Sequence, residues 1–174
     1  MNATLEITGT DMPAPISKPA PAKPGKIKIL LTDDDPAIRQ ILLRLLTEEG
    51  YSVLTATNGV EALELAKVTK FDIALLDLNM PVKDGWETFK QLSTRQPALP
   101  IILITARPNQ LFPALASGVV ALLEKPLDLT KLFLTIHNFL EEPLETRMAR
   151  SEGRPAVFSY IPPKPDASAA EKTD

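Results

Sequence analysis

The chain has 174 residues, 44% of them apolar and 24% charged, with a formal net charge of −3. These values are ordinary for one globular domain with tails, and they give no basic field that would attract nucleic acid or an anionic membrane. The chain has no cysteine, which excludes disulfides, thiolate metal sites and a cysteine nucleophile, and because no signal sequence or membrane span is evident we expect a cytoplasmic protein.

The first segment, residues 1–26, is rich in Pro, Ala and Lys, with five prolines between Pro13 and Pro24. Such a segment cannot bury enough apolar surface to offset the entropy lost on ordering. We expect a disordered N-terminal extension here, followed by a folded domain over residues 27–142.

Strand and helix patterns alternate through the folded part. Asp35 and Pro36 supply an N-cap and a proline at the first helical position, and Gly50 ends the first helix. The run at residues 71–76 is almost continuously apolar, as in a parallel strand covered on both faces. Strands are expected at residues 27–31, 51–55, 71–76, 100–104 and 119–123, with helices between them and a last helix over residues 128–141.

This alternation predicts an α/β fold with a five-stranded parallel sheet, doubly wound with helices on both faces. The segment between Thr105 and Gly118 contains Pro108 and Pro113, so the fourth helix should be short or irregular. In such sheets a binding site forms beyond the carboxyl ends of the strands.

Polar side chains follow four of the predicted strands. Asp33 and Asp34 follow the first strand, Asp77 the third, Thr105 the fourth and Lys125 the fifth. Carboxylates that converge at one edge repel unless a cation joins them, and a hard ion with oxygen ligands, Mg²⁺ first, is the natural one. A carboxylate beside such an ion, a lysine and a hydroxyl is suited to accepting a phosphoryl group.

Taken together these motifs resemble the receiver domain of response regulators, the signalling proteins of two-component systems. The resemblance covers residues 26–142. Its matching motifs are ILLTDDDPAI at 29–38, DIALLDLNMP at 72–81, DG at 84–85, ITA at 104–106 and EKP at 124–126.

The resemblance implies a (βα)₅, flavodoxin-like receiver fold and a role for each matching residue. Asp77 becomes the phosphoacceptor, and Thr105 and Lys125 contact the phosphoryl group. Mg²⁺ (or Mn²⁺) would be held by Asp33, Asp34 and Asp77 and by the backbone carbonyl of Asn79. Three further residues would shape the loops around the site: Pro81, Gly85 and Pro126.

One position departs from the family. Leu122 stands where these domains usually carry an aromatic residue that moves when the domain is activated. Leu122 cannot copy that motion, and the segment after Thr105 is short. We therefore expect phosphorylation to act mainly by ordering residues 106–118.

The resemblance implies a phosphorylation-dependent switch, not an enzyme. Its phosphoryl donor would be a histidine kinase or a phosphotransfer protein, and it would signal through contacts with an unknown downstream protein, with a homodimer possible. We expect no nucleic-acid or membrane partner, and a stand-alone receiver, because the residues after the last helix form neither a helix-turn-helix core nor a basic stripe.

Two alternatives remain from the sequence. One is a receiver-like interaction module that is never phosphorylated. The other is an aspartate-nucleophile phosphohydrolase, which usually has a second acid two residues after the nucleophile, where this chain has Asn79.

The last segment, residues 143–174, is expected to be a flexible C-terminal tail. It contains an apolar island from Ala156 to Ile161, followed by two prolines. Two interpretations are open: a linker with incidental aromatic residues, or a docking segment that binds a partner or this domain as an added strand.

Overall fold

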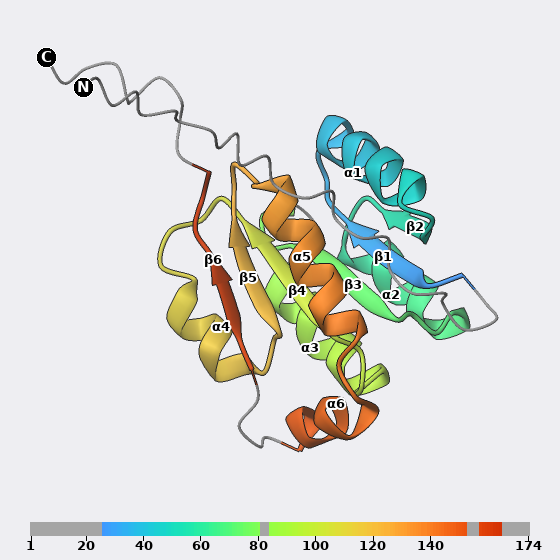
Figure 1. The fold of residues 1–174 in the computed structure, drawn as a ribbon, viewed down its shortest axis with the longest axis vertical. Helices are drawn as coiled ribbons and strands as arrows, with labels where there is room; N and C mark the ends of the chain where they lie inside the picture. Colours follow the sequence, from blue (N-terminus) through green and yellow to red (C-terminus); the bar gives the residue numbers. More distant parts are fainter. Residues whose placement is uncertain (1–25, 81–83, 153–156, 165–174) are drawn as a thin grey trace, which may run out of the picture.

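The computed structural model describes residues 26–80, 84–152 and 157–164. These form a single parallel sheet with helices on both faces (Figure 1). The strands lie in the order β2-β1-β3-β4-β5-β6, and every neighbouring pair is parallel. The strands are β1 (Lys28–Thr32), β2 (Ser52–Ala56), β3 (Ile73–Asp77), β4 (Ile101–Thr105), β5 (Ala121–Glu124) and β6 (Ser159–Ile161).

The helices follow the strands in strict alternation as far as α5. Helix α1 begins with its proline directly after Asp35, whose carboxylate accepts hydrogen bonds from the amides of Ala37 and Ile38. The helices are α1 (Pro36–Glu48), α2 (Gly59–Val68), α3 (Gly85–Arg95), α4 (Leu111–Ser117), α5 (Leu129–Leu140) and α6 (Leu144–Ser151).

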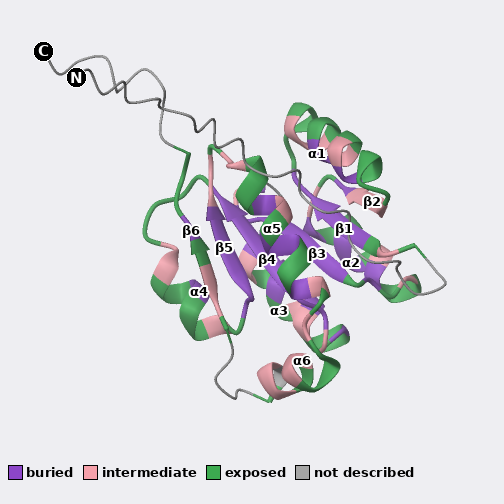
Figure 2. Ribbon diagram, in the orientation of Figure 1, coloured by how far each residue is buried: buried purple, intermediate pink, exposed green. Residues whose placement is uncertain are grey.

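The core lies in two layers, one on each face of the sheet. Helices α1 and α5 cover one face, where Leu42, Leu46 and Ile136 pack on the strands. Helices α2, α3 and α4 cover the other, with Leu63 and Leu92 inside. Figure 2 shows that burial is concentrated in the central strands, while the outer faces of the helices are exposed. The predicted doubly wound parallel fold is confirmed.

Helix α4 is short, as the two prolines of the segment after Thr105 predicted. It has seven residues, and Pro113 lies in its first turn, where a missing amide removes no helical hydrogen bond. Gly118 ends the helix with a φ of 84°, a left-handed conformation that glycine adopts without strain.

The structure has six strands where five were predicted, and its described residues after position 142 form a helix and a strand where a flexible tail was predicted. Helix α6 follows α5 closely, and the guanidinium of Arg147 donates to the backbone carbonyls of Phe139, Leu140 and Glu142 at the end of α5. Arg150 and Glu142 form a largely buried ion pair. The chain then adds β6 to the edge of the sheet, so the folded unit extends to Lys164.

Three further expectations concern the N-terminal extension, a membrane span and the apolar island. The expected N-terminal extension lies outside the described residues, except for Lys26. Among the residues that the structure describes, no helix is both long and apolar enough to cross a bilayer. The apolar island is a docking segment for this domain at residues 159–161, because these residues pair with β5.

Candidate functional site

Four strands end at one edge of the sheet, and the polar groups predicted for the site lie at the last residues of these strands or directly after them. Asp33 follows β1, Asp77 is the last residue of β3, Thr105 is the last residue of β4, and Lys125 follows β5. The parallel register places these ends side by side, since Asp77 pairs with Ile104 and Thr105 with Glu124. The sheet therefore assembles side chains that lie far apart in the sequence.

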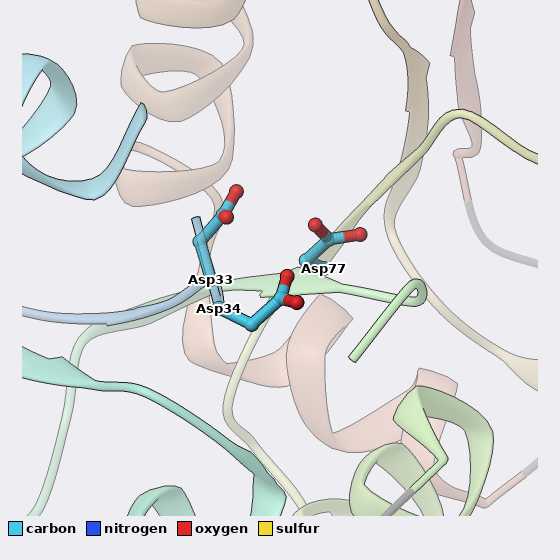
Figure 3. A group of neighbouring side chains, drawn as sticks. All are labelled: Asp33, Asp34 and Asp77. Carbon is cyan, nitrogen blue, oxygen red and sulfur yellow. The ribbon is translucent and has the colours of Figure 1, made fainter. Parts of the chain in front are cut away.

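The three carboxylates of Asp33, Asp34 and Asp77 form a cluster (Figure 3). One oxygen from each lies within 4.8 Å of the others. Asp33 and Asp77 are each 1% exposed, whereas Asp34 lies on the surface. Two nearly buried carboxylates beside a third repel one another strongly, because little water remains to screen them.

Lys125 partly neutralises this cluster. Its Nζ lies 2.6 Å from Oδ2 of Asp77 and 3.1 Å from Oδ2 of Asp33. Burial alone would lower the pKa of Lys125, but its hydrogen bonds and attraction to Asp77 and Asp33 outweigh burial, and the net shift is upward. Lys125 is therefore fully protonated near neutral pH.

Asp33 keeps an unfavourable environment despite that lysine. Burial raises the pKa of Asp33, and the hydrogen bond and charge of Lys125 compensate for burial only in part. One lysine faces three acids, which leaves an excess of negative charge. A divalent cation with oxygen ligands fits this donor set, because carboxylates are its preferred ligands and its charge would balance the excess.

Backbone hydrogen bonds fix the orientation of the two buried acids. The Asp33 carboxylate accepts a bond of 2.9 Å from the amide of Asp35, and Oδ1 of Asp77 accepts one of 2.8 Å from the amide of Asn79. Each acid therefore keeps one oxygen on the backbone and turns the other toward Lys125. Such support holds a reactive carboxylate in one orientation.

Thr105 is completely buried at the end of β4. Its hydroxyl donates to Oδ1 of Asn79 over 3.4 Å and accepts a 2.9 Å bond from the amide of Arg107. The first of these is long and therefore weak. The hydroxyl can turn toward a new acceptor at the site without losing a strong bond.

Two contacts join the loop after Thr105 to the start of α3. The guanidinium of Arg107 lies 3.8 Å from a carboxylate oxygen of Asp84, and the indole of Trp86 donates a 3.0 Å bond to Gln110. The loop after β4 is therefore held against the loop that follows Asp77.

Sequence reasoning missed Arg39. Its guanidinium donates to the carbonyls of Asp33, at 2.7 Å, and Asp34, at 3.3 Å, so it holds the backbone that carries two acids of the cluster. The available signal was a basic residue in the first turn of the helix that follows the acidic run. The pattern alone does not show whether such a side chain turns toward the acidic run or toward solvent.

Four other residues were singled out in the sequence: Pro81, Gly85, Leu122 and Pro126. Gly85 is buried against the chain at Asp77 and Leu78. Pro126 lies after Lys125, joined by a cis peptide bond. Pro81 lies outside the described residues. Leu122 is completely buried on the face of β5 that α4 covers.

Known proteins resemble this chain in sequence. The family model described as the response regulator receiver domain matches residues 29–137. The chain is 38% identical to the transcriptional regulatory protein GlrR of Escherichia coli (strain K12) over 116 residues, which are 66% of this chain and 26% of that protein. The chain therefore spans about a quarter of that relative's length.

Two solved structures show the same fold. One is a CheY-like response regulator receiver domain protein from Methanospirillum hungatei JF-1, with a TM-score of 0.65 and 28% identity over 70% of this chain and 98% of that one. The other is the response regulator TrrA from Thermotoga maritima in complex with Mg²⁺ and BeF, with a TM-score of 0.61 and 30% identity over 65% of this chain and 98% of that one.

Proposed function

The chain belongs to the response regulator receiver domain family, and from this premise we propose that it is a signalling switch that accepts a phosphoryl group on Asp77. The observation that carries the proposal is the position of the Asp77 carboxylate. It is almost fully buried, 2.6 Å from the Lys125 ammonium, and it lies inside the acidic cluster. Packing of a hydrophobic core does not require two acids and a lysine at this position.

The proposed step is an in-line transfer. A carboxylate oxygen of Asp77 attacks phosphorus and forms an acyl phosphate, while the bond from phosphorus to the donor breaks and the donor leaves with the electron pair. The Lys125 ammonium, already beside Asp77, then pairs with an oxygen of the phosphoryl group, and the Thr105 hydroxyl donates to another. Both contacts stabilise negative charge that the transfer brings to the site.

Mg²⁺ would be held by Asp33, Asp34 and Asp77 with the backbone carbonyl of Asn79, and it would supply positive charge for the phosphoryl oxygens. The acidic cluster supports this assignment, as does the Mg²⁺ and BeF bound to a related receiver. Arg39 and the Asp35 amide would keep the backbone of the acid pair in place while the charge of the site changes.

The donor, in this proposal, is a histidine kinase or a phosphotransfer protein, and the signal leaves by protein contacts. The chain serves as a switch and not as an enzyme with turnover. The direct test is incubation with acetyl phosphate and Mg²⁺, followed by intact-mass measurement. One added phosphoryl group, lost when Mg²⁺ is chelated, is the expected result.

Magnesium should stabilise the protein through this cluster. At about ten times its Kd a ligand adds roughly 1.4 kcal/mol to the free energy of unfolding. We expect the melting temperature to rise with millimolar Mg²⁺, and the rise to be much smaller in Asp34→Ala. Asp35→Asn is the matched control, because asparagine keeps the helix cap and Asp35 is not a proposed ligand. An equal rise in both variants contradicts the assignment of Asp34.

Occupation of the site should order the loop after Thr105. The Thr105 hydroxyl would bind the phosphoryl group and tether residues 106–118, which include α4, and each residue that becomes fully fixed loses up to roughly 1–2 kcal/mol of backbone entropy. Hydrogen exchange with and without beryllofluoride and Mg²⁺ should show protection gained over residues 106–118, and less change around Leu122. Protection gained in β4 and β5 with an unchanged loop would support the conventional mechanism instead.

A further inference from the structure

The last strand of the sheet comes from the segment beyond α6. Residues 159–161 pair in parallel with residues 121–123 of β5, and the amide of Ser159 donates a 3.0 Å bond to the carbonyl of Val120. Ile161 is buried on the face that α5 covers, while Phe158 packs on the face that α4 covers. We refer to residues 157–164 as the tail strand. It covers the edge of β5.

The tail strand makes contacts on both sides of Lys125. The amide of Lys164 donates a 2.9 Å bond to the carbonyl of Pro126, directly after Lys125. On the other side, the Tyr160 phenol lies near the carboxylate of Glu124, and partial burial and that carboxylate raise the pKa of the phenol. Three consecutive residues thus connect two regions: Glu124 and Pro126 hold the tail strand, and Lys125 between them holds Asp77 and Asp33.

We propose that the tail strand restrains phosphorylation of Asp77 by fixing residues 124–126, and that a phosphoryl group at Asp77 in turn loosens the tail strand from β5. The proposal rests on the function proposed above, and it adds an internal regulator of the same site.

The restraint follows from the position that Lys125 must hold. With the tail strand docked, the backbone on each side of Lys125 is fixed, and Nζ lies 2.6 Å from Oδ2 of Asp77. A phosphoryl group on Asp77 occupies the space around that carboxylate, so Nζ has to move to reach a phosphoryl oxygen. Docking therefore favours the unphosphorylated arrangement, and by thermodynamic linkage a phosphoryl group disfavours docking by the same factor.

The tail strand is well suited to detach. Its paired part has three residues, and Tyr160 and the described residues after Ile161 are exposed. Segments with little buried apolar surface open at low free energy. A modest change at residues 124–126 is then enough to shift the docking equilibrium.

The decisive test uses the full chain and removes one hydrogen-bond donor. Lys164→Pro deletes the amide that bonds Pro126, and Lys164→Ala is the matched control, which loses the same side chain but keeps the amide. A second pair, Ser159→Pro and Ser159→Ala, does the same for the bond to Val120. Beryllofluoride is titrated into each variant in saturating Mg²⁺, and its Kd is measured by calorimetry. Each proline variant should bind at least fivefold more tightly than its alanine control, at the lower end of common coupling factors.

Hydrogen exchange gives the reciprocal measurement on the unchanged protein. Amides 159–161 should exchange faster once beryllofluoride and Mg²⁺ are bound. Equal affinities within both variant pairs, or slower exchange at residues 159–161, would overturn the restraint while leaving Asp77 as the acceptor. If beryllofluoride binds neither the unchanged protein nor any variant, the proposed function itself fails.

Discussion

Asp77→Asn is expected to take up no phosphoryl group from acetyl phosphate in Mg²⁺, while the unchanged protein takes up one. An amide has no anionic oxygen to attack phosphorus, so the loss should be complete within detection. Asparagine has nearly the shape of aspartate, and its single oxygen can keep the bond from the Asn79 amide while the bond from Lys125 is lost, so the fold should persist. The measurement is intact mass after incubation, with circular dichroism to show that the variant is folded.

The matched control is Asp72→Asn, which changes another acid beside the same strand. Asp72 precedes β3 at its opposite end and accepts a bond from the amide of Lys28, away from the acidic cluster. It should be labelled like the unchanged protein. Labelling of Asp77→Asn at the level of Asp72→Asn would mean that the phosphoryl group resides elsewhere, and the assignment of Asp77 would be wrong.

Gly85→Ala is expected to be strongly destabilising. A Cβ at this position would lie 2.5 Å from Cα of Leu78 and 2.7 Å from the carbonyl oxygen of Asp77. Both are backbone atoms at the end of a buried strand and cannot give way as a side-chain tip does. Overpacking of a close-packed interior costs roughly 1–3 kcal/mol, and contacts this short with backbone atoms place the change at the upper end of that range. The free energy of unfolding in urea measures it.

The substitution should also slow labelling, because relief of the clash displaces the backbone of Asp77. Gly118→Asn is the control: nothing lies within 4 Å of a Cβ there, and asparagine tolerates the left-handed conformation of that residue. It should change stability little and labelling not at all. If Gly85→Ala is as stable and as readily labelled as Gly118→Asn, the close approach of Gly85 has no role in placing Asp77.

Much of the architecture could be predicted from the sequence because its signals are local. Asp35 and Pro36 mark the start of α1, and the apolar run before Asp77 has the character of a buried parallel strand. Strand-end residues of a parallel sheet converge by geometry, and the structure does place Asp33, Asp77, Thr105 and Lys125 together. Their roles in phosphotransfer remain predictions.

The sixth strand was not predictable in the same way. Its paired part spans three residues within a polar and proline-rich segment, so it has no periodic pattern of its own. What fixes it is the free edge of β5 and the space for Ile161 beside α5, and both exist only after the rest has folded. Arg39 was missed for a related reason, because side-chain direction depends on where the preceding loop runs.

Pro162 and Pro163 follow the last strand directly and determine what its outer edge can do. An edge strand normally presents a row of free amides and carbonyls on which another chain can form a further strand, and such edges favour aggregation. Here that row ends after three residues, because proline has no amide hydrogen to donate. A docked tail thus gives the sheet a boundary that resists extension by another molecule, whereas an undocked tail would leave the longer, proline-free edge of β5 open to pairing.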